Sequence, residues 1–239
     1  MISVFGINYI AFAIEQETMH KAPEAGMILG TSRFLFPDVW GTVAYLSSFL
    51  LFIPGLLMII SITNEYSFKT HRQNIIDGWS RLDFIYVKLA DAVILAITAT
   101  LIMFITALVF GISSGGFSAL SFSGSLYVFY FFIQSLSYIA VALLFGILFK
   151  RSGIAIGVFF LYAVVIENLV AGILNRYAGG IGAYLPLEST DNLIPFPFLK
   201  SVVDQIVKRP DTNYLLIAAC IYLVLYFLFS KRKFQTDDL

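Results

Sequence analysis

Glu167 is the residue of this sequence with the most unusual setting, because it lies with Asn168 inside a long apolar stretch. An ionised carboxylate at the centre of a bilayer costs at least ~2.5 kcal/mol on membrane-insertion scales. The apolar stretches hold no deep lysine or arginine that would offset this charge. We therefore expect Glu167 to face protein or a wet cavity. There it lines a substrate path or a dimer interface, or it is a neutral acid hydrogen-bonded to a Ser or Tyr on a neighbouring helix.

A second polar set recurs at helical spacing in the preceding apolar stretch and comprises Tyr127, Tyr130, Gln134 and Tyr138. Steps of three or four residues place these side chains on one face of a helix. A structural polar seam is the favoured interpretation, and a binding surface is the alternative. The candidate pathway or interface residues are Glu167, Asn168, Tyr130, Gln134 and Tyr138.

The longest polar segment is NEYSFKTHRQNIIDGWSRLDFIYVK, from Asn64 to Lys88. On a helix, one face would be apolar, formed by Phe68, Ile75, Ile76 and Trp79, and the other polar, formed by Lys69, Thr70, Gln73, Asn74 and Asp77. Gly78 is a common helix terminator. This pattern predicts an amphipathic helix of about three turns, which either lies in the headgroup layer with Trp79 as anchor or docks a soluble partner.

The elements that must position these residues are membrane helices. The chain is 59% hydrophobic and 13% charged, with mean hydropathy +0.87, whereas soluble domains carry about 25% charged residues. A span needs about 20 apolar residues. The predicted spans cover about 2–14, 40–62, 87–113, 125–149, 153–174 and 213–230. The predicted fold is therefore an all-α, polytopic membrane bundle of six helices, forming a single transmembrane domain over residues 1–239.

Two of these spans are irregular. The first, Ile2 to Ile14, would give about 20 Å of helix at 1.5 Å per residue, against a hydrocarbon core of about 30 Å. It is either a half-span or a span whose beginning precedes the start used here, and we favour the second interpretation. In the span over 40–62, Pro54 is expected to kink the helix because its ring clashes with the carbonyl four residues back.

The basic residues predict the orientation. The short connection KRS at Lys150 and the tail KRKF are rich in positive charge, whereas SSGGFSALSFSG carries none. By the positive-inside rule, the 64–86 segment and the C-terminus are cytoplasmic. Residues 175–212 then form an outer loop. Its positions Leu199 to Val207 have the spacing of an amphipathic helix lying on the outer membrane surface.

Several classes of function are disfavoured. The sequence has no G-x-x-x-x-G-K-[ST], H-E-x-x-H or G-x-S-x-G motif, and its two histidines, His20 and His71, fall outside the spans. The single cysteine, Cys220, excludes an internal disulfide and a cysteine metal cluster. Zero formal charge gives no basic face for nucleic acid. We expect a chain that is not an enzyme and binds no metal or cofactor itself.

The Asn64 to Lys88 segment resembles the cytoplasmic loop of type-2 permeases of the ATP-binding-cassette (ABC) exporter family. There an acid closing the second span precedes Gly-Thr, a short helix, Pro-x-Ser-Arg and a lysine at the next span. The matching positions here are Glu65, Thr70, Ser80, Arg81 and Lys88, while Lys69 replaces the glycine and Gly78 the proline. The string RQNIIDGWSR, the span order and a PFPF-containing outer loop extend the resemblance over nearly the whole chain. The family's elbow helix before the first span has no counterpart here.

The resemblance implies that the segment is a coupling helix pressed into a groove of a separate ATP-binding subunit, which would hold ATP and Mg²⁺. The implied contact residues are Glu65, Phe68, Thr70, Arg72, Asp77, Gly78, Trp79, Ser80 and Arg81. Instead of contacting the ATP-binding subunit, Arg81 could pair with Asp77 or Asp83 within the loop.

The resemblance also implies a multi-pass protein of a bacterial cytoplasmic (inner) membrane that pairs with a second permease copy, in a homodimer by preference over a heterodimer. The expected activity is export of a lipid, peptide or hydrophobic drug from the cytoplasm or inner leaflet. One alternative is a resistance or immunity permease acting on antibiotic peptides at the outer leaflet. The other is a non-transporting membrane scaffold or sensor, whose amphipathic loop would be a lipid anchor.

Overall fold

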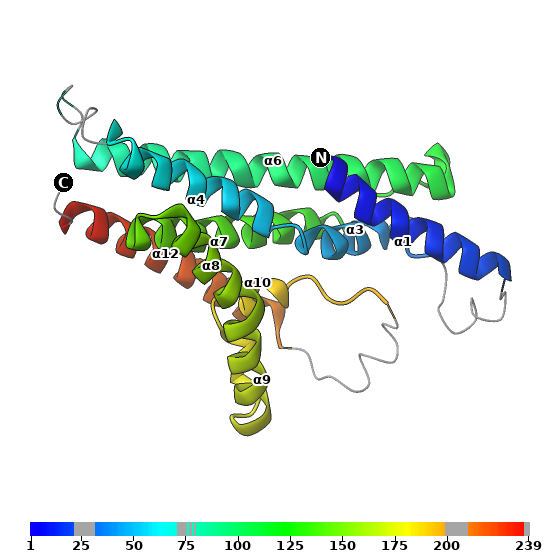
Figure 1. Ribbon diagram of the computed structural model, residues 1–239. Coiled ribbons are helices and arrows are strands. Elements are labelled where there is room, and N and C mark those ends of the chain that lie inside the picture. Colours follow the sequence, from blue (N-terminus) through cyan, green and yellow to red (C-terminus); the bar gives the residue numbers. More distant parts are fainter. Residues whose placement is uncertain (22–31, 71–75, 77, 79, 199–209, 237–239) are drawn as a thin grey trace.

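The computed structural model describes residues 1–21, 32–70, 76, 78, 80–198 and 210–236, and of Arg81 only the backbone. All regular elements in these ranges are helices (Figure 1), which confirms the all-α prediction. The longer ones are α1 (Ile2–Lys21), α3 (Val39–Ser48), α4 (Phe52–Ser67), α6 (Arg81–Gly115), α7 (Leu126–Phe149), α8 (Ser152–Phe160), α9 (Glu167–Tyr177) and α12 (Thr212–Thr236). The short ones are α10 (Glu188–Asp191), the 3₁₀ helices η1 (Phe117–Ala119) and η3 (Ile181–Tyr184), and the π-helical turn η2 (Leu161–Ile166) between α8 and α9.

Four helices are long and apolar enough to cross a membrane, and they identify a multi-pass membrane protein. They cover Leu82–Gly115, Leu126–Phe149, Ser152–Tyr177 and Thr212–Thr236. The predicted spans 87–113, 125–149, 153–174 and 213–230 fall on these helices. The predicted span 40–62 falls on α3 and α4, which together make a fifth candidate. The predicted span 2–14 lies in α1, which continues to Lys21 and is not among the candidates.

The predicted kink at Pro54 is confirmed. The axes of α3 and α4 differ by 44°, and Pro54 stands in the first turn of α4, where its missing N–H costs no helical hydrogen bond. The carbonyl of Leu50 accepts instead from the N–H of Ile53 at 3.0 Å. The break places Phe49 and Phe52 on the side of the bundle that holds the cavity described below.

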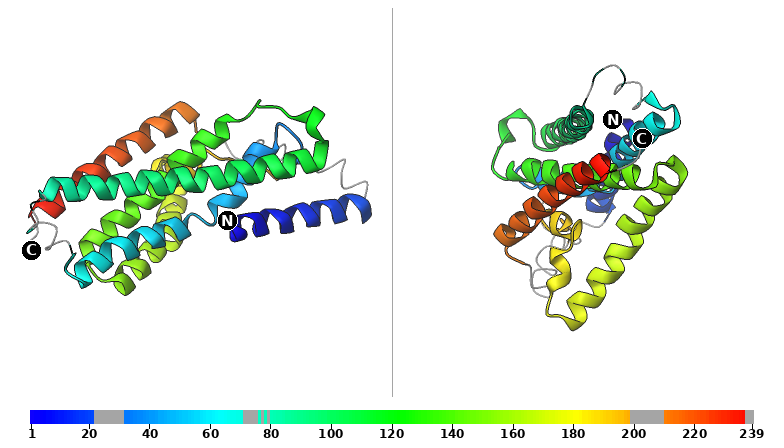
Figure 2. Two further views of the ribbon diagram at one scale, coloured as in Figure 1. Left: turned by 90° about the horizontal axis from the view of Figure 1, so that it is seen from above. Right: turned by 90° about the vertical axis from the view of Figure 1, so that its left-hand side faces the viewer.

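Helix α7 is the central helix of the bundle. It packs against α4, α6 and α12 (Figures 1 and 2) and buries residues along its whole length, among them Phe131, Ile139 and Leu143. Close approach to α4 depends on Gly146, where an added Cβ would meet the Ile62 side chain at 2.3 Å. Since α7 carries Gln134, which is buried, and Tyr138, which is half-buried, it brings these polar groups towards the interior.

The two ends of the bundle differ in charge. At one end α4 and α12 finish, α6 begins, and the α7–α8 connection carries Lys150 and Arg151. Lys150 lies over the Tyr66 ring at 5.4 Å, and Lys231 lies over the Tyr86 ring at 5.9 Å. The connection between α6 and α7 at the other end, residues 116–125, has no charged residue. The basic end is the one that the positive-inside rule assigns to the cytoplasm.

The region predicted as an outer loop, 175–212, folds back against the bundle over part of its length. Helix α10 packs against α7, α9 and α12, and η3 packs against α9. Leu187, Ser189 and Ile194 are buried. The physical reason is that Leu187 and Ile194 are apolar, so folding back removes their side chains from solvent. The amphipathic helix predicted over Leu199 to Val207 lies outside the described residues.

A glycine in η3 permits this return. At Gly182 an added Cβ would lie 2.3 Å from the carbonyl oxygen of Ala171 and 2.7 Å from Oδ1 of Asn175. We expect Gly182→Ala to destabilise the protein by about 1–3 kcal/mol because a backbone atom must move. Gly172→Ala is the matched control, since nothing lies within 4 Å of a Cβ there. Thermal unfolding of both purified variants checks this, and equal midpoints would contradict the close approach.

Candidate functional site

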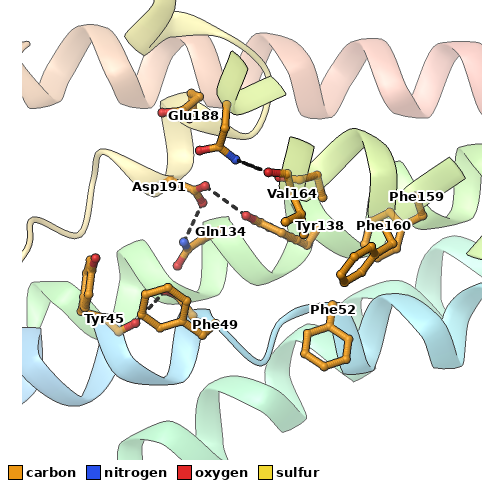
Figure 3. A pocket seen from close by; sticks show the side chains of 13 residues that line it. Tyr45, Phe49, Phe52, Gln134, Tyr138, Phe159, Phe160, Val164, Glu188 and Asp191 are labelled. Atoms are coloured by element: carbon orange, nitrogen blue, oxygen red, sulfur yellow. Dashed lines mark hydrogen bonds between the residues drawn. The ribbon is translucent and has the colours of Figure 1, made fainter. Parts of the chain in front are cut away.

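A cavity of about 340 Å³ opens between the α3–α4 bend, α7, the α8–α9 helix and α10 (Figure 3). Its size is within the range of small-molecule sites. Aromatic side chains and a few polar groups share its wall. The lining residues are Tyr45, Ser48, Phe49, Phe52, Gln134, Tyr138, Phe159, Phe160, Ala163, Val164, Asn168, Glu188 and Asp191.

Asp191 is the polar centre of this wall. Nε2 of Gln134 donates to Oδ1 of Asp191 at 2.8 Å, and the Tyr138 hydroxyl donates to Oδ2 at 3.0 Å (Figure 3). The two donors are four residues apart on α7, which places them on one face of that helix. The Asp191 carboxylate therefore fixes α10 against α7.

The pKa of Asp191 is raised to about 7, chiefly by burial. The negative charges of Glu188 and Glu167 act in the same direction, and the two hydrogen bonds from α7 oppose them. Burial first, and the charge of Glu167 second, also raise the pKa of Glu188. The three acids thus share a site that is poor in positive charge.

Glu167 holds the start of α10. Its Oε1 accepts from the backbone N–H groups of Leu187 and Glu188, the latter at 3.1 Å. These amides belong to the N-terminal end of α10, where helical N–H groups lack intrahelical acceptors. Glu167 is 3% exposed, and Tyr162 lies close to its carboxyl group. The expectation that Glu167 faces protein is confirmed.

A π-helical turn precedes this glutamate. Six residues of the Ser152–Tyr177 helix, Leu161–Ile166, adopt it directly before Glu167. A π turn holds about one residue more than an α turn, so the side chains that follow are rotated relative to an unbroken α-helix, and such turns are frequent at functional sites. The rotation accompanies the placement of Glu167 towards α10 and of Asn168 on the cavity wall.

The structure brings together most of the predicted pathway residues. Gln134, Tyr138 and Asn168 line the cavity, and Glu167 supports the helix that carries Glu188 and Asp191. Nδ2 of Asn168 donates hydrogen bonds to the backbone carbonyls of Ala163 and Val164, both at 3.2 Å. Tyr130 is not part of the wall; its ring lies 5.9 Å from that of Tyr127, edge-on.

Two lining acids escaped sequence reasoning. Glu188 and Asp191 lie three residues apart in LPLESTDNLIP, a stretch of the predicted outer loop that mixes apolar and polar residues. The spacing of these two acids, about one helical turn, was the available signal that they share a face. Across the described residues, no group of three or more His, Cys, Asp or Glu side chains is arranged to hold a metal ion.

The predicted partner-binding segment is described only in part. Arg72, Asp77 and Trp79, with the side chain of Arg81, lie outside the described residues, and so does most of the predicted coupling helix. Phe68 and Ile76 are exposed at 75% and 78%. Thr70 is also exposed, and its hydroxyl reaches the carbonyl of Glu65 at 3.5 Å.

Two of the predicted contact residues have partners inside the chain. Glu65 forms an ion pair of 2.5 Å with Lys88, and this pair ties α4 to α6. Lys88 also lies 3.3 Å from Asp91. Ser80 is the N-cap of α6. Its hydroxyl accepts from the N–H of Asp83, and the Asp83 carboxylate accepts from the N–H of Ser80, a complete capping box. Both residues fix the point where the segment joins α6.

The backbone around the segment is left-handed at two places. Lys69 has φ 57° and Gly78 has φ 100°. Glycine adopts such values without steric cost, whereas a lysine is uncommon there. The chain therefore makes a glycine-like turn at Lys69 directly after α4 and another at Gly78 before α6.

No curated protein matches the sequence. A family model described as "Protein of unknown function (DUF2705)" matches residues 11–239, which is nearly the whole chain. By this match the chain belongs to the DUF2705 family.

Proposed function

We propose that the chain is the membrane-spanning subunit of an ABC exporter in a bacterial cytoplasmic membrane. It would pair with a second permease copy, a homodimer being favoured, and dock separate subunits that bind and hydrolyse ATP with Mg²⁺. One observation carries the proposal most. The Asn64–Lys88 segment joins two candidate spans at the basic end of the bundle and keeps the large apolar side chains Phe68 and Ile76 exposed.

Two local interactions anchor the ends of the segment. The Lys88–Glu65 ion pair joins the end of α4 to the start of α6, and the capping box fixes the first turn of α6. Both helices pack on α7. A displacement of the segment by an ATP-driven partner would therefore reach α7, which carries two of the cavity-lining side chains.

The backbone conformation at Lys69 supports the resemblance, although the residue type at this position differs from the family pattern. Lys69 stands where the permease family has glycine, and its φ of 57° is a conformation that glycine adopts freely. The backbone of this chain at Lys69 is thus compatible with the glycine of the family pattern. Gly78, at the proline position, has φ 100°, which proline cannot adopt, so the approach to α6 differs from the family pattern.

The cavity supplies a candidate substrate path. It lies between the kinked α3–α4 pair, α7 and the α8–α9 helix, which slopes away from α6 (Figure 2). Helices that diverge and kink leave room that a second copy or a substrate could fill. Transport would move substrate from the cytoplasm or inner leaflet outwards when the ATPase pair closes.

Charge reversal at Arg81 tests the proposal. We expect Arg81→Glu to abolish recovery of an ATP-binding subunit with the tagged protein, while membrane insertion and yield stay normal. Helix α6 should tolerate the change, because an acid in its first turn complements the helix dipole. Affinity purification in mild detergent followed by mass spectrometry gives the readout.

Arg176→Glu is the matched control. Arg176 lies in the last turn of α9, away from the segment, and its reversal should leave recovery of the ATP-binding subunit unchanged. Undiminished recovery with Arg81→Glu would remove the assigned docking role of Arg81. Recovery of the wild-type chain alone would favour the scaffold or sensor.

A further inference from the structure

We propose that the cavity around Asp191 binds the protonated amine of an amphipathic, aromatic or apolar molecule. This proposal deepens the exporter assignment and rests on it only in treating the ligand as the transported substrate. Four properties of the described cavity wall support it, namely charge, hydrogen-bonding capacity, aromatic character and size.

The wall carries two acids and no balancing cation among its lining residues. Glu188 and Asp191 line the cavity, and Glu167 lies behind α10, whereas no Lys, Arg or His is among the lining residues. Buried carboxylates without a cation are costly, so they are paired or neutralised in proteins. A cationic ligand would supply the missing charge, and an anionic ligand would be repelled.

The unused hydrogen-bonding capacity of the wall points the same way. Gln134 is 2% exposed, and its Nε2 is committed to Asp191. Its Oε1 is buried and has no partner among the described residues. The amide nitrogen of Asn168 likewise donates already, to two carbonyls of its own helix. The buried Oε1 of Gln134 is therefore an open acceptor in the wall, which a ligand that donates N–H groups would satisfy.

The rest of the wall suits an apolar body. Aromatic side chains come from the α3–α4 bend, from α8 and from α7, namely Tyr45, Phe49, Phe52, Tyr138, Phe159 and Phe160 (Figure 3). Aromatic faces attract a nearby ammonium group and also pack against ring systems. A volume of about 340 Å³ admits a molecule of a few fused rings with a short side chain.

Tryptamine, a neutral analogue and an anionic analogue form the probe series that tests this proposal. Radiolabelled tryptamine is bound to the purified full-length protein in nanodiscs of zwitterionic phosphatidylcholine, with indole-3-ethanol and indole-3-propionate as competitors of the same ring. We expect saturable tryptamine binding and at least tenfold weaker competition by either analogue. Equal competition by all three would overturn the proposal, and so would absence of saturable binding.

Two variants locate the binding. Asp191→Asn keeps the shape and removes the charge, and it should weaken tryptamine binding at least tenfold. Asp38→Asn neutralises an exposed acid outside the cavity and should leave binding unchanged. Equal affinity of both variants would overturn the assignment to Asp191. If Asp191→Asn fails to fold, the wild-type competition series decides alone.

The pH dependence gives an independent readout. Because the pKa of Asp191 is about 7 and an alkylammonium keeps its proton to about pH 10, we expect tryptamine binding to tighten about tenfold between pH 6 and pH 8. The other titratable groups close to Asp191 and its neighbouring acids are Tyr45, Tyr138, Tyr162, Glu167, Glu188, Tyr222 and Tyr226. Binding that weakens as the pH rises would contradict a role for ionised Asp191.

These measurements need no ATP-binding subunit. Tryptamine binding by a chain that purifies without an ATPase would sustain the site and refute the exporter. Recovery of an ATPase with a chain that binds none of the probes would sustain the exporter and refute the amine site.

Discussion

Replacing Lys88 with methionine is expected to destabilise the protein by about 3 kcal/mol, the low end of the range for breaking a buried ion pair. The Lys88 side chain is 7% exposed and lies 2.5 Å from Glu65, which is 23% exposed. Methionine fills similar space but removes the ion pair that Glu65 forms with Lys88 between α4 and α6. Some remaining contact of Glu65 with water keeps the loss from being larger. Thermal unfolding of the purified variant measures it.

A double-mutant cycle separates charge from packing. Lys88→Met combined with Glu65→Gln should recover a large part of the lost stability, because the charge of the less exposed acid, at position 65, is removed as well, and of the two acids that Lys88 pairs with only the more exposed Asp91 keeps its charge. Lys21→Met is the matched control, since the Lys21–Glu17 pair is mostly exposed and such pairs contribute ~0–1 kcal/mol. Additive losses in the cycle would show that the ion pair does not tie α4 to α6.

Replacing Glu167 with leucine is expected to release α10 from the bundle. Leucine leaves the N–H groups of Leu187 and Glu188 without their acceptor, at about 1–3 kcal/mol for each unsatisfied buried group. Glu167→Gln keeps a side-chain oxygen as acceptor and should retain the packing. The contrast distinguishes loss of the acceptor from loss of the charge.

Cysteine accessibility measures the release. In a Cys220→Ala background, a cysteine at the fully buried Ser189 should react slowly with maleimide. Adding Glu167→Leu should accelerate labelling at least tenfold, and adding Glu167→Gln should not. Equal labelling in both variants would mean that the glutamate does not hold α10. If Glu167→Gln stops transport while α10 stays protected, the ionised acid has a role beyond this support.

The helices were predictable because their signals are local. Long apolar runs located the spans on α6, α7, the Ser152–Tyr177 helix and α12, and Pro54 predicted the bend. Glu167 was predictable as a protein-facing residue because its charge is costly in lipid. The extent of α1 was underestimated. The polar residues after Ile14 predicted a loop. In the structure the helix continues through them to Lys21, and Glu17 and Lys21, one turn apart, form an ion pair on it.

The centre of the site was not predictable from local pattern. Asp191 acquires its chemistry from Gln134 and Tyr138, more than 50 residues away in sequence. No periodicity within the 175–212 region indicates that it returns to α7. The same holds for Glu65, which sequence reasoning assigned to a partner and which the fold pairs with Lys88. Tertiary contacts between distant segments decide both cases.

Site-specific cross-linking tests the central claim, that the Asn64–Lys88 segment docks an ATP-binding subunit. A photoreactive benzoylphenylalanine would replace Ile76, which is 78% exposed in this segment, and in a separate protein Phe117, which is 75% exposed at the opposite end of α6. After illumination of native membranes, the account predicts a covalent adduct with an ATP-binding protein from position 76 and none from position 117. Adducts with lipid alone at position 76 would contradict the account and identify the segment as a membrane-surface anchor.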